Sequence, residues 1–531
     1  MAALVVALGA AGATVAAHTP SWHAPFVGDD AEALLWALGS EGPLPRPNPH
    51  LRPLTLASLR ADHAVAGLDP WAYHLTNIAL HLAVGALVAG CASALHRRLR
   101  PGAPGSALVG AAVGAVFVLL PTHTEAVSWV IGRSYVLAAA GALGATWVWF
   151  RGDGPPRPTA RAAASGALLL GLLANEVAIT TPFAVAALAA GLAWARPRGE
   201  RDVRGAVLGT APLVLVGLAY LALRVLTLGS LGGAYGAEGS YDAGPRLVGR
   251  ALALVARAVV PGVGPLGWVV AAVVGAVAVG VVVVTRWWRT PGARLAAGAV
   301  GAALLAALPG AGLGVSLTST EGERLAYVAS GFLVLALVGP VAAAVDAVGR
   351  APGRRLGAAA VAAVAVVTAA VGLAGIDARW REAGALAGAV HGDRRAFADE
   401  GAGAVVLVAP DTLEGAYVGR NALAATTLLE HGWTDPTQVT EVVPVALSAP
   451  DATIPVRPVA GADRTWRIDL SGDDVAPAPV PGGGPAFEVE GVAVRRVAAD
   501  TLQVELGPGV DLSTVWYLSG GRLRPLRPAG G

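Results

Sequence analysis

The sequence predicts an all-α protein that crosses a membrane about eleven times and carries a small α+β domain at its C-terminal end. Of its 531 residues, 55% are hydrophobic and only 14% are charged, which is too apolar for an ordinary soluble surface. Long apolar runs fill most of the first 376 residues, and more polar, alternating sequence follows them. We therefore expect a transmembrane domain at residues 1–376 and a mostly β domain at 377–531.

The expected spans are apolar runs that can form helices of about 20 residues, the length that crosses a bilayer. The first run lacks a positively charged start, so we interpret it as a span rather than a signal peptide. The run 246–260 differs because arginines recur in it at helical spacing, and we expect an interfacial or re-entrant helix there. The eleven spans are placed at 1–17, 74–95, 106–121, 135–150, 162–174, 177–195, 205–228, 266–285, 295–315, 325–348 and 356–376.

The basic residues, all of them arginine, predict the orientation. Their clusters fall between alternate spans and therefore on one side, which the positive-inside rule assigns to the cytoplasm. The composition, rich in Ala, Gly and Val, is typical of a GC-rich bacterial genome, so we expect a bacterial inner membrane. The dispersed net charge of +2 gives no basis for nucleic-acid binding. The clusters lie at 97–100, 151–161, 196–204, 286–294 and 350–355.

Two regions are expected on the extracytoplasmic side. The loop 18–72 is long for a connection between helices, and we expect short helices in it at 31–38 and 54–65. Beyond residue 376 we expect an amphipathic helix at 379–400 and a strand at 404–409 that ends in a Pro-Asp turn. Further strands are predicted at 465–470, 487–494, 502–506 and 515–518, with no tetratricopeptide-like repeat.

Ionisable side chains gather on the predicted outer side, where spans begin and end. Such groups are costly near membrane depth, so their clustering indicates a functional site. The single cysteine, Cys91, excludes an intrachain disulfide, and the histidines lack the spacing of a metal site. The outer residues are Asp29, Asp30, Arg52, His74, His81, His123, Glu125, Arg133, Glu176, Arg224 and Arg324.

The Asp29-Asp30 pair has two interpretations. Aspartate caps helices well, and a helix is expected directly after the pair. Paired carboxylates just outside a first span also suit general-base catalysis, which we favour. Arg324, at the outer mouth of a span, could bind a lipid phosphate through paired hydrogen bonds or simply mark the interface.

The remaining candidates also have a structural interpretation beside the functional one. His123 and Glu125 could snorkel at a helix end, and Arg133 could anchor the next helix. Glu176 could be a solvated turn residue between two apolar runs. His74 and His81 lie seven residues apart on one helix face, where packing and hydrogen bonding are more common than metal binding.

Five stretches carry a resemblance to a known family when they are taken together. They are Phe-Val-Gly-Asp-Asp at 26–30, Leu-Arg-Pro-Leu at 51–54, the run 68–77, the segment 121–133 with Pro-Thr-His-Thr-Glu-Ala-Val, and Glu-Arg-Leu-Ala-Tyr at 323–327. In order and spacing the sequence resembles the transmembrane O-mannosyltransferase (TMTC) family of the GT-C superfamily, which also includes the protein O-mannosyltransferases.

The resemblance implies a GT-C fold and a membrane glycosyltransferase that moves a sugar, mannose by analogy, from a polyprenyl phosphate to a protein or glycan hydroxyl on the extracytoplasmic face. No cofactor or metal beyond this lipid-linked donor is implied. With Asp29 as the base the reaction would invert the sugar, and Asp30 would orient the base or the acceptor. Donor binding is assigned to His123, Glu125, Arg133, Arg324 and Glu176, and support of the acceptor or loop to Arg52, His74 and Asn77.

Departures from the family pattern keep alternatives open. Leu120 stands in place of a histidine, Tyr135 in place of an acidic residue and Asn175 in place of a lysine, which leaves room for an inactive relative. A lipid-sugar flippase or transporter would also bury charges near the membrane, but it predicts charges at mid-span and related halves. An oligosaccharide ligase that uses a lipid diphosphate would share the outer site.

Overall fold

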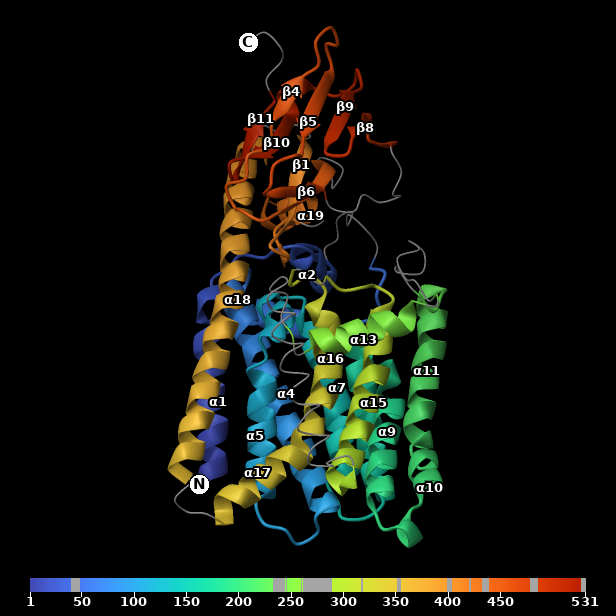
Figure 1. Ribbon diagram of the computed structural model, residues 1–531. Helices are drawn as coiled ribbons and strands as arrows, with labels where there is room; N and C mark the ends of the chain where they lie inside the picture. Colours follow the sequence, from blue (N-terminus) through green and yellow to red (C-terminus); the bar gives the residue numbers. More distant parts are fainter. Residues whose placement is uncertain are drawn as a thin grey trace.

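The computed structural model describes residues 1–39, 48–232, 244, 246–258, 260, 289–316, 319–350, 355–398, 404–419, 422–431, 439–477 and 486–526. A bundle of long helices occupies one end of the molecule and a sheet domain the other (Figure 1). The helices of the bundle end are α1 (Ala2–His18), α2 (Asp30–Leu38), α3 (Pro53–Ala66), α4 (Pro70–Leu99), α5 (Ser106–Val118), α6 (Thr124–Ser128), α7 (Arg133–Phe150), α8 (Pro158–Ala174), α9 (Thr181–Ala195), α10 (Val203–Leu208), α11 (Ala211–Leu228), α13 (Leu247–Arg257), α15 (Pro291–Ala311), α16 (Tyr327–Leu333), α17 (Val338–Arg350) and α18 (Arg355–Ala398).

The chain is a multi-pass membrane protein. Among the described residues, seven helical segments are long and apolar enough to cross a membrane, and α5 with 121–128, bent by 61°, would make an eighth. The expected count of eleven is therefore not confirmed. The expected span at 266–285 lies outside the described residues. The helices at two other expected spans, α7 and the shorter α8, are not among the seven. The seven segments are Ala2–Ser21, Pro70–Leu99, Glu176–Ala195, Arg198–Leu228, Pro291–Ala311, Glu323–Gly349 and Ala363–Asp393.

Small residues let helices of the bundle approach at backbone distance. Where α9 and α15 meet, a Cβ atom added to Gly298 would lie 2.7 Å from the Ala187 carbonyl oxygen and 3.0 Å from the Cα of Gly191. Gly141 of α7 and Gly171 of α8 meet in the same way. Membrane helices lack a strong hydrophobic drive to associate, so such close packing supplies much of the contact energy.

The short helices of the first loop and the helix expected at 246–260 are present. The helices α2 and α3 confirm the expectations at 31–38 and 54–65 to within a few residues. The helix α13 lies across the ends of α15 and α16 instead of running along them (Figure 1). Its buried Arg257 pairs with Glu323 at 2.5 Å and donates to the backbone carbonyls of Ser316 and Ser319.

The helix α18 connects the bundle to the sheet domain. Its 44 residues run without a break from one to the other, because no proline interrupts them (Figure 1). The expected domain boundary at residue 376 falls inside this helix. Asp377, at that point, accepts hydrogen bonds from Ser128 at 2.6 Å and from the ring of His18 at 3.1 Å.

The described part of the C-terminal domain contains two sheets, one α-helix and a short 3-10 helix at Leu512–Thr514. In the first sheet the order is β11-β10-β1-β3-β6, with β1 parallel to β10 and β3 and with β2 paired to β1. The second is antiparallel, in the order β4-β5-β9-β8-β7. The elements are β1 (Ala404–Leu413), β2 (Ala416–Tyr417), α19 (Ala422–His431), β3 (Val439–Leu447), β4 (Val456–Pro458), β5 (Thr465–Asp469), β6 (Val475–Pro477), β7 (Ala486–Val489), β8 (Val492–Ala498), β9 (Thr501–Leu506), β10 (Val515–Ser519) and β11 (Arg522–Pro525).

Three of the expected strands are confirmed, as β5, β9 and β10, and two expectations are wrong. The strand at 404–409 does not end at a Pro-Asp turn: β1 continues to Leu413, because the pairing register shifts between Pro410 and Thr412 and accommodates the proline. The run 487–494 is two strands, because Glu490 (φ 46°) and Gly491 (φ 80°) form a turn in its middle.

We expect Gly298→Ala to destabilise the protein by roughly 1–3 kcal/mol, because the new methyl group would press on the backbone of α9. Gly301→Ala on the same helix is the matched control, since its Cβ would lie 3.8 Å from Ala187. Thermal unfolding in detergent micelles measures both variants. Equal unfolding temperatures for the two would contradict the proposed close packing of α9 on α15.

Candidate functional site

The predicted outer residues lie at the junction between the bundle and the sheet domain. The helix α2, which opens at the aspartate pair, sits directly under the sheet domain (Figure 1). Residues Ala425 and Leu428 of α19 pack with Ala31 and Leu35 of α2. The site is therefore enclosed between the first loop and the C-terminal domain, at the end of the bundle opposite the Arg97 and Arg98 cluster.

The two aspartates have different surroundings. Asp29 is the N-cap residue of α2 and is partly exposed. Asp30 is 1% exposed, and its two carboxylate oxygens accept the backbone amides of Val27 at 3.0 Å and Ile131 at 2.8 Å. Burial raises the pKa of Asp30 to about 7, although the two amides oppose that shift. Asp30 therefore joins the first loop to the segment after α6.

Glu125 and Arg324 form an ion pair at the centre of the junction. Glu125 is fully buried and also accepts the backbone amides of Gly322 at 3.2 Å and Arg324 at 2.6 Å. The phenol of Tyr417, from strand β2 of the sheet domain, donates to Glu125 at 3.1 Å and also contacts the Arg324 guanidinium. A buried carboxylate needs such partners, because an unpaired one costs several kcal/mol.

Aromatic rings surround the Arg324 guanidinium. Its central carbon lies 5.1 Å from the ring centre of Trp129, 5.5 Å from that of Tyr417 and 5.9 Å from that of Tyr135. These distances are in the range of cation–π attraction. Tyr135 thus occupies, with an aromatic face, the position where the family pattern has an acidic residue.

The same rings hold the segment that carries the aspartates. The Trp129 indole nitrogen donates to the carbonyl of Val27 at 3.2 Å. A Cβ added to Gly28, whose φ is +54°, would lie 3.2 Å from the Cβ of Tyr417. Glycine is favoured here because the backbone is left-handed and the tyrosine is close. Asp29 therefore follows directly after the glycine that packs against Tyr417, and the hydroxyl of Tyr417 contacts Arg324.

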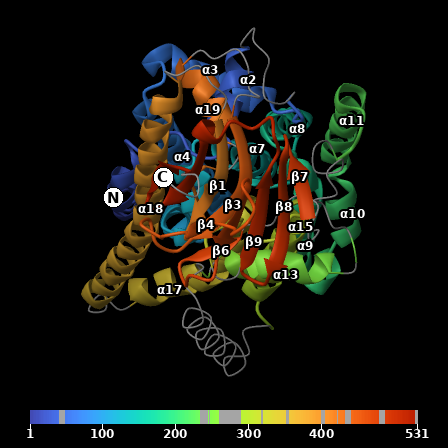
Figure 2. The same cartoon turned by 90° about the horizontal axis from the view of Figure 1, so that it is seen from above.

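A cavity of about 520 Å³ opens beside this cluster. Seven of its fifteen lining residues are leucine, isoleucine, valine or proline, and Tyr135, another of them, also belongs to the rings around Arg324. Its polar side holds Glu176 between Arg52, at 2.8 Å, and Arg224, at 3.7 Å. The helix α11, which supplies Arg224, lies at the edge of the bundle opposite α18 (Figure 2).

His50 lies near these charges. Burial, assisted by the positive charge of Arg52, lowers the pKa of His50 to about 3, so the ring is neutral. The cavity is thus an apolar chamber whose charged groups are two guanidinium groups and one carboxylate, which gives it a positive polar side. That arrangement suits an anion attached to an apolar chain.

Three predicted site residues make structural contacts. Arg133 is fully buried and donates to Asp62 at 2.5 Å and to the Tyr73 carbonyl at 2.9 Å, joining α7 to α3 and α4. The Asn77 amide donates to three carbonyls between residues 127 and 130. The His74 ring shares a hydrogen bond with the Ala24 carbonyl at 3.1 Å. These contacts give the three residues a structural role. Direct binding of Arg133 to the lipid-linked sugar donor stays a prediction.

His123 lies in a buried histidine cluster beneath the site. Its Nε2 shares a hydrogen bond with Ser330 at 2.8 Å, and its ring centre lies 5.3 Å from that of His81 and 4.6 Å from that of Tyr327. The ring of His18 is 6.4 Å from His81. Within the described part of the chain, no group of His, Cys, Asp and Glu side chains has the geometry of a metal site.

Sequence reasoning missed Tyr417, Trp129 and the His18–Asp377 pair. Tyr417 lies 292 residues from Glu125 and belongs to a strand of only two residues, so no local pattern identifies it. The one local signal is Gly415 two residues before it, since glycine is typical of tight turns. Glu414 and Gly415 indeed both have left-handed backbones, with φ of 48° and 87°, and the turn aims Tyr417 at the bundle.

The fold and junction define a multi-pass membrane protein with a charged, aromatic site under a sheet domain. The chain is 35% identical over 119 residues to "Protein O-mannosyl-transferase TMTC2" of Mus musculus, a match that covers 19% of this chain and 13% of the relative. It is 35% identical over 181 residues to "Protein O-mannosyl-transferase Tmtc2" of Drosophila melanogaster, covering 32% of this chain and 17% of the relative. "Protein O-mannosyl-transferase TMTC3" of Mus musculus matches at 32% over 105 residues, 20% of this chain and 10% of the relative.

The similarity supports the family resemblance while covering less than a fifth of each of these relatives. No family model matches the chain. No solved structure matches it either. The named relatives suggest a membrane glycosyltransferase.

We expect Tyr417→Phe to lower stability by roughly 1–2 kcal/mol, because the buried Glu125 would lose one hydrogen-bond donor while the ring stays in place. Tyr517→Phe on β10 is the matched control, since its hydroxyl has no hydrogen-bond partner among the described residues. Thermal unfolding is again the measurement. An equal drop in unfolding temperature for Tyr517→Phe would contradict a specific contribution of the Tyr417–Glu125 hydrogen bond to stability.

The raised pKa of Asp30 predicts a pH-dependent stability. Between its ordinary value of 3.8 and about 7, the folded state holds a proton that the unfolded state releases. The free energy of unfolding should therefore fall as the pH rises from about 4 to 7, by at most about 1.4 kcal/mol per pH unit. Asp30→Asn should remove this slope and Asp69→Asn, at the N-cap of α4, should keep it. An unchanged slope in Asp30→Asn would refute the assignment.

Proposed function

We propose that this protein is a membrane glycosyltransferase that moves a sugar, mannose by analogy with its relatives, from a polyprenyl phosphate to a hydroxyl of a protein. The observation that carries the proposal is the cavity lined by Arg52, Arg224 and aliphatic side chains, whose lining residue Tyr135 also faces the Arg324 guanidinium. In this proposal residues 1–376 form a GT-C-type transferase domain with 18–72 as the catalytic loop, and residues 377–531 form an outer domain that contributes Tyr417.

The donor fits the cavity by its chemistry. A polyprenyl chain is apolar and can lie against the leucine side of the chamber, which gains free energy from the apolar area buried. The phosphate requires cations, and a guanidinium matches it with paired hydrogen bonds. The two cations proposed to bind the phosphate are Arg224, on helix α11, and Arg324, in the segment before α16.

The proposed reaction is a direct displacement at the anomeric carbon. The bond between that carbon and the phosphate oxygen breaks, and its electron pair leaves with the lipid phosphate. The acceptor oxygen bonds to the opposite face of the sugar and gives its proton to a carboxylate, so the configuration inverts. Arg324 would stabilise the phosphate charge that develops, because its guanidinium is already oriented by Glu125 and the aromatic rings.

Asp29 is the proposed base and Asp30 its support. Both oxygens of Asp30 are occupied by backbone amides, whereas Asp29 is partly exposed at the start of α2. Glu125, although acidic, is fully buried and bound to Arg324, which suits a positioning role. Tyr135 contributes an aromatic face to the same guanidinium, which supports retained activity despite the departure at that position.

The proposed location is the inner membrane of a bacterium, with the site and the sheet domain outside the cytoplasm. The arginine clusters support this orientation, because Arg98, Arg196 and Arg294 meet at the end of the bundle away from the sheet domain.

Asp29→Asn should reduce transfer of radiolabelled mannose from synthetic polyprenyl-phosphate-mannose to membrane proteins by about 10²–10⁴-fold, as expected for loss of a general base. Asp69→Asn, in the same loop and with its capping ability retained, should keep wild-type activity. Full activity in Asp29→Asn would exclude it as the base. If the wild type transfers no sugar from any polyprenyl phosphate, the proposal fails in favour of a flippase or an inactive relative.

Arg224→Gln should raise the KM for the lipid donor about tenfold or more with a smaller effect on kcat, because Arg224 contacts the bound phosphate rather than the reacting atoms. Arg246→Gln, at the exposed N-terminus of α13, removes the same charge outside the cavity and is the control. Initial rates measured against donor concentration distinguish the two variants. Equal KM values would remove Arg224 from the donor site.

A further inference from the structure

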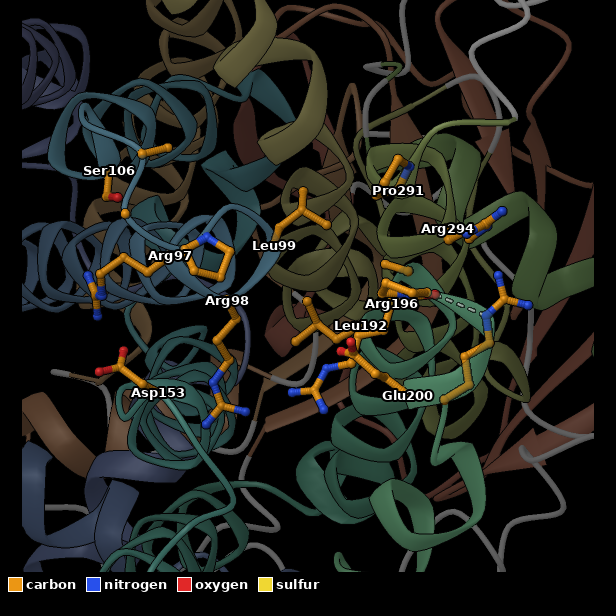
Figure 3. Close-up of a pocket in the computed structure, with 16 residues that line it drawn as sticks. Arg97, Arg98, Leu99, Ser106, Asp153, Leu192, Arg196, Glu200, Pro291 and Arg294 are labelled. Atoms are coloured by element: carbon orange, nitrogen blue, oxygen red, sulfur yellow. Dashed lines mark hydrogen bonds between the residues drawn. The ribbon is translucent and has the colours of Figure 1, made fainter.

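A second cleft lies at the opposite end of the bundle from the proposed active site. It has a volume of about 1160 Å³ and forms where the C-terminal ends of α4 and α9 meet the N-terminal ends of α5 and α15 (Figure 3). The proposed transfer reaction uses none of its residues. Ten of the side chains around it are labelled in Figure 3.

The cleft is strongly basic. Five arginines and two carboxylates line it, so the lining carries a net charge of +3, from five minus two. The arginines come from separate segments: the end of α4, the end of α9, the loop that follows α9 and the start of α15. Topology alone requires arginines on this side, but it does not require them to converge on one hollow. The charged residues are Arg97, Arg98, Arg196, Arg201, Arg294, Asp153 and Glu200.

The arginines differ in how far the fold already uses them. Arg98 donates to the carbonyls of Phe150 and Gly152, and so it holds the C-terminal end of α7. The guanidinium of Arg196 forms no hydrogen bond or ion pair with the described residues. Among the described residues Arg294 makes one hydrogen bond, to the Trp194 carbonyl at 3.3 Å, and it lies over the Trp194 ring. Arg97 likewise makes one, to the Arg151 carbonyl at 3.4 Å. Arg196 is therefore the arginine that the described fold uses least, and Arg294 is the candidate from the α15 side of the cleft.

A smaller hollow of mixed lining adjoins the basic cleft. It has a volume of about 240 Å³ and shares Arg98, Leu192 and Arg196 with the cleft. Trp149 and Phe150 form part of its wall, and Arg161 and Asp202 also line it. A basic cleft that continues past aromatic and aliphatic side chains matches a molecule that has a phosphate at one end and a hydrocarbon chain at the other.

We propose that this cleft binds the phosphate of an anionic phospholipid through Arg196 and Arg294. The headgroup phosphate would accept paired hydrogen bonds from the two guanidinium groups, and part of an acyl chain would occupy the hollow beside Leu192. A free phosphate or diphosphate offers the same oxygen chemistry, but it leaves the wall formed by Trp149 and Phe150 without a partner. The inference is independent of the proposed transfer reaction.

The test uses the full-length protein in a neutral detergent. Its unfolding temperature is measured against increasing phosphatidylglycerol, against phosphatidylcholine, and against pyrophosphate at constant ionic strength. We expect phosphatidylglycerol to raise the unfolding temperature, and the double variant Arg196→Gln with Arg294→Gln to require at least about tenfold more lipid for half of that rise, as for loss of two charge-assisted hydrogen bonds.

The matched control is Arg198→Gln with Arg204→Gln, which removes the same charge from exposed positions at the same end that do not line the cleft. A rise that this control retains and the cleft variant loses supports the proposal. A rise lost equally in both, or given equally by phosphatidylcholine, overturns the site. A response to pyrophosphate alone overturns the lipid as its ligand. A cleft variant unfolded at the start is replaced by Arg196→Gln alone, whose guanidinium supports no other described residue.

Discussion

The buried carboxylate of Glu125 is the point on which the outer end of the molecule depends. A carboxylate without solvent must be surrounded by donors, and Glu125 obtains them from the Arg324 guanidinium, two backbone amides and the Tyr417 phenol. These donors come from the segment before α16 and from the sheet domain. A single charge therefore joins three parts of the chain and holds Arg324 among the rings of Trp129, Tyr135 and Tyr417.

The sheet domain is consequently part of the site rather than an attachment to it. The helix α18 passes from the bundle into that domain, and its Asp377 is held by His18 and Ser128 from below. The tight turn after β1, whose Glu414 pairs with Arg379 of α18 at 2.9 Å, directs Tyr417 into the bundle. A domain anchored at both points can hold Arg324 in a fixed orientation, which is what electrostatic stabilisation of a leaving phosphate requires.

The sequence predicted the features that depend on hydrophobic periodicity and on local residue preferences. Apolar runs gave most of the described spans, and the short helices around Asp30 and Leu59 were found because capping and amphipathic patterns are local. It did not predict the unbroken α18 or the continuation of β1 through Pro410, since packing and a register shift decide those. Of the residues at the junction, Glu125 and Arg324 were among the predicted ones, whereas Tyr417, Trp129 and the His18–Asp377 pair were not. Contacts between residues 292 positions apart leave no local signature.

The central claim is that one lipid-linked donor lies with its phosphate between Arg224 and Arg324 and its sugar toward Asp29. A cryo-electron microscopy structure of the full chain in a lipid nanodisc, with polyprenyl-phosphate-mannose bound, tests it most directly. The account predicts phosphate density in contact with both guanidinium groups and polyprenyl density along the apolar wall of the cavity. Donor density elsewhere, with this cavity empty, would contradict it.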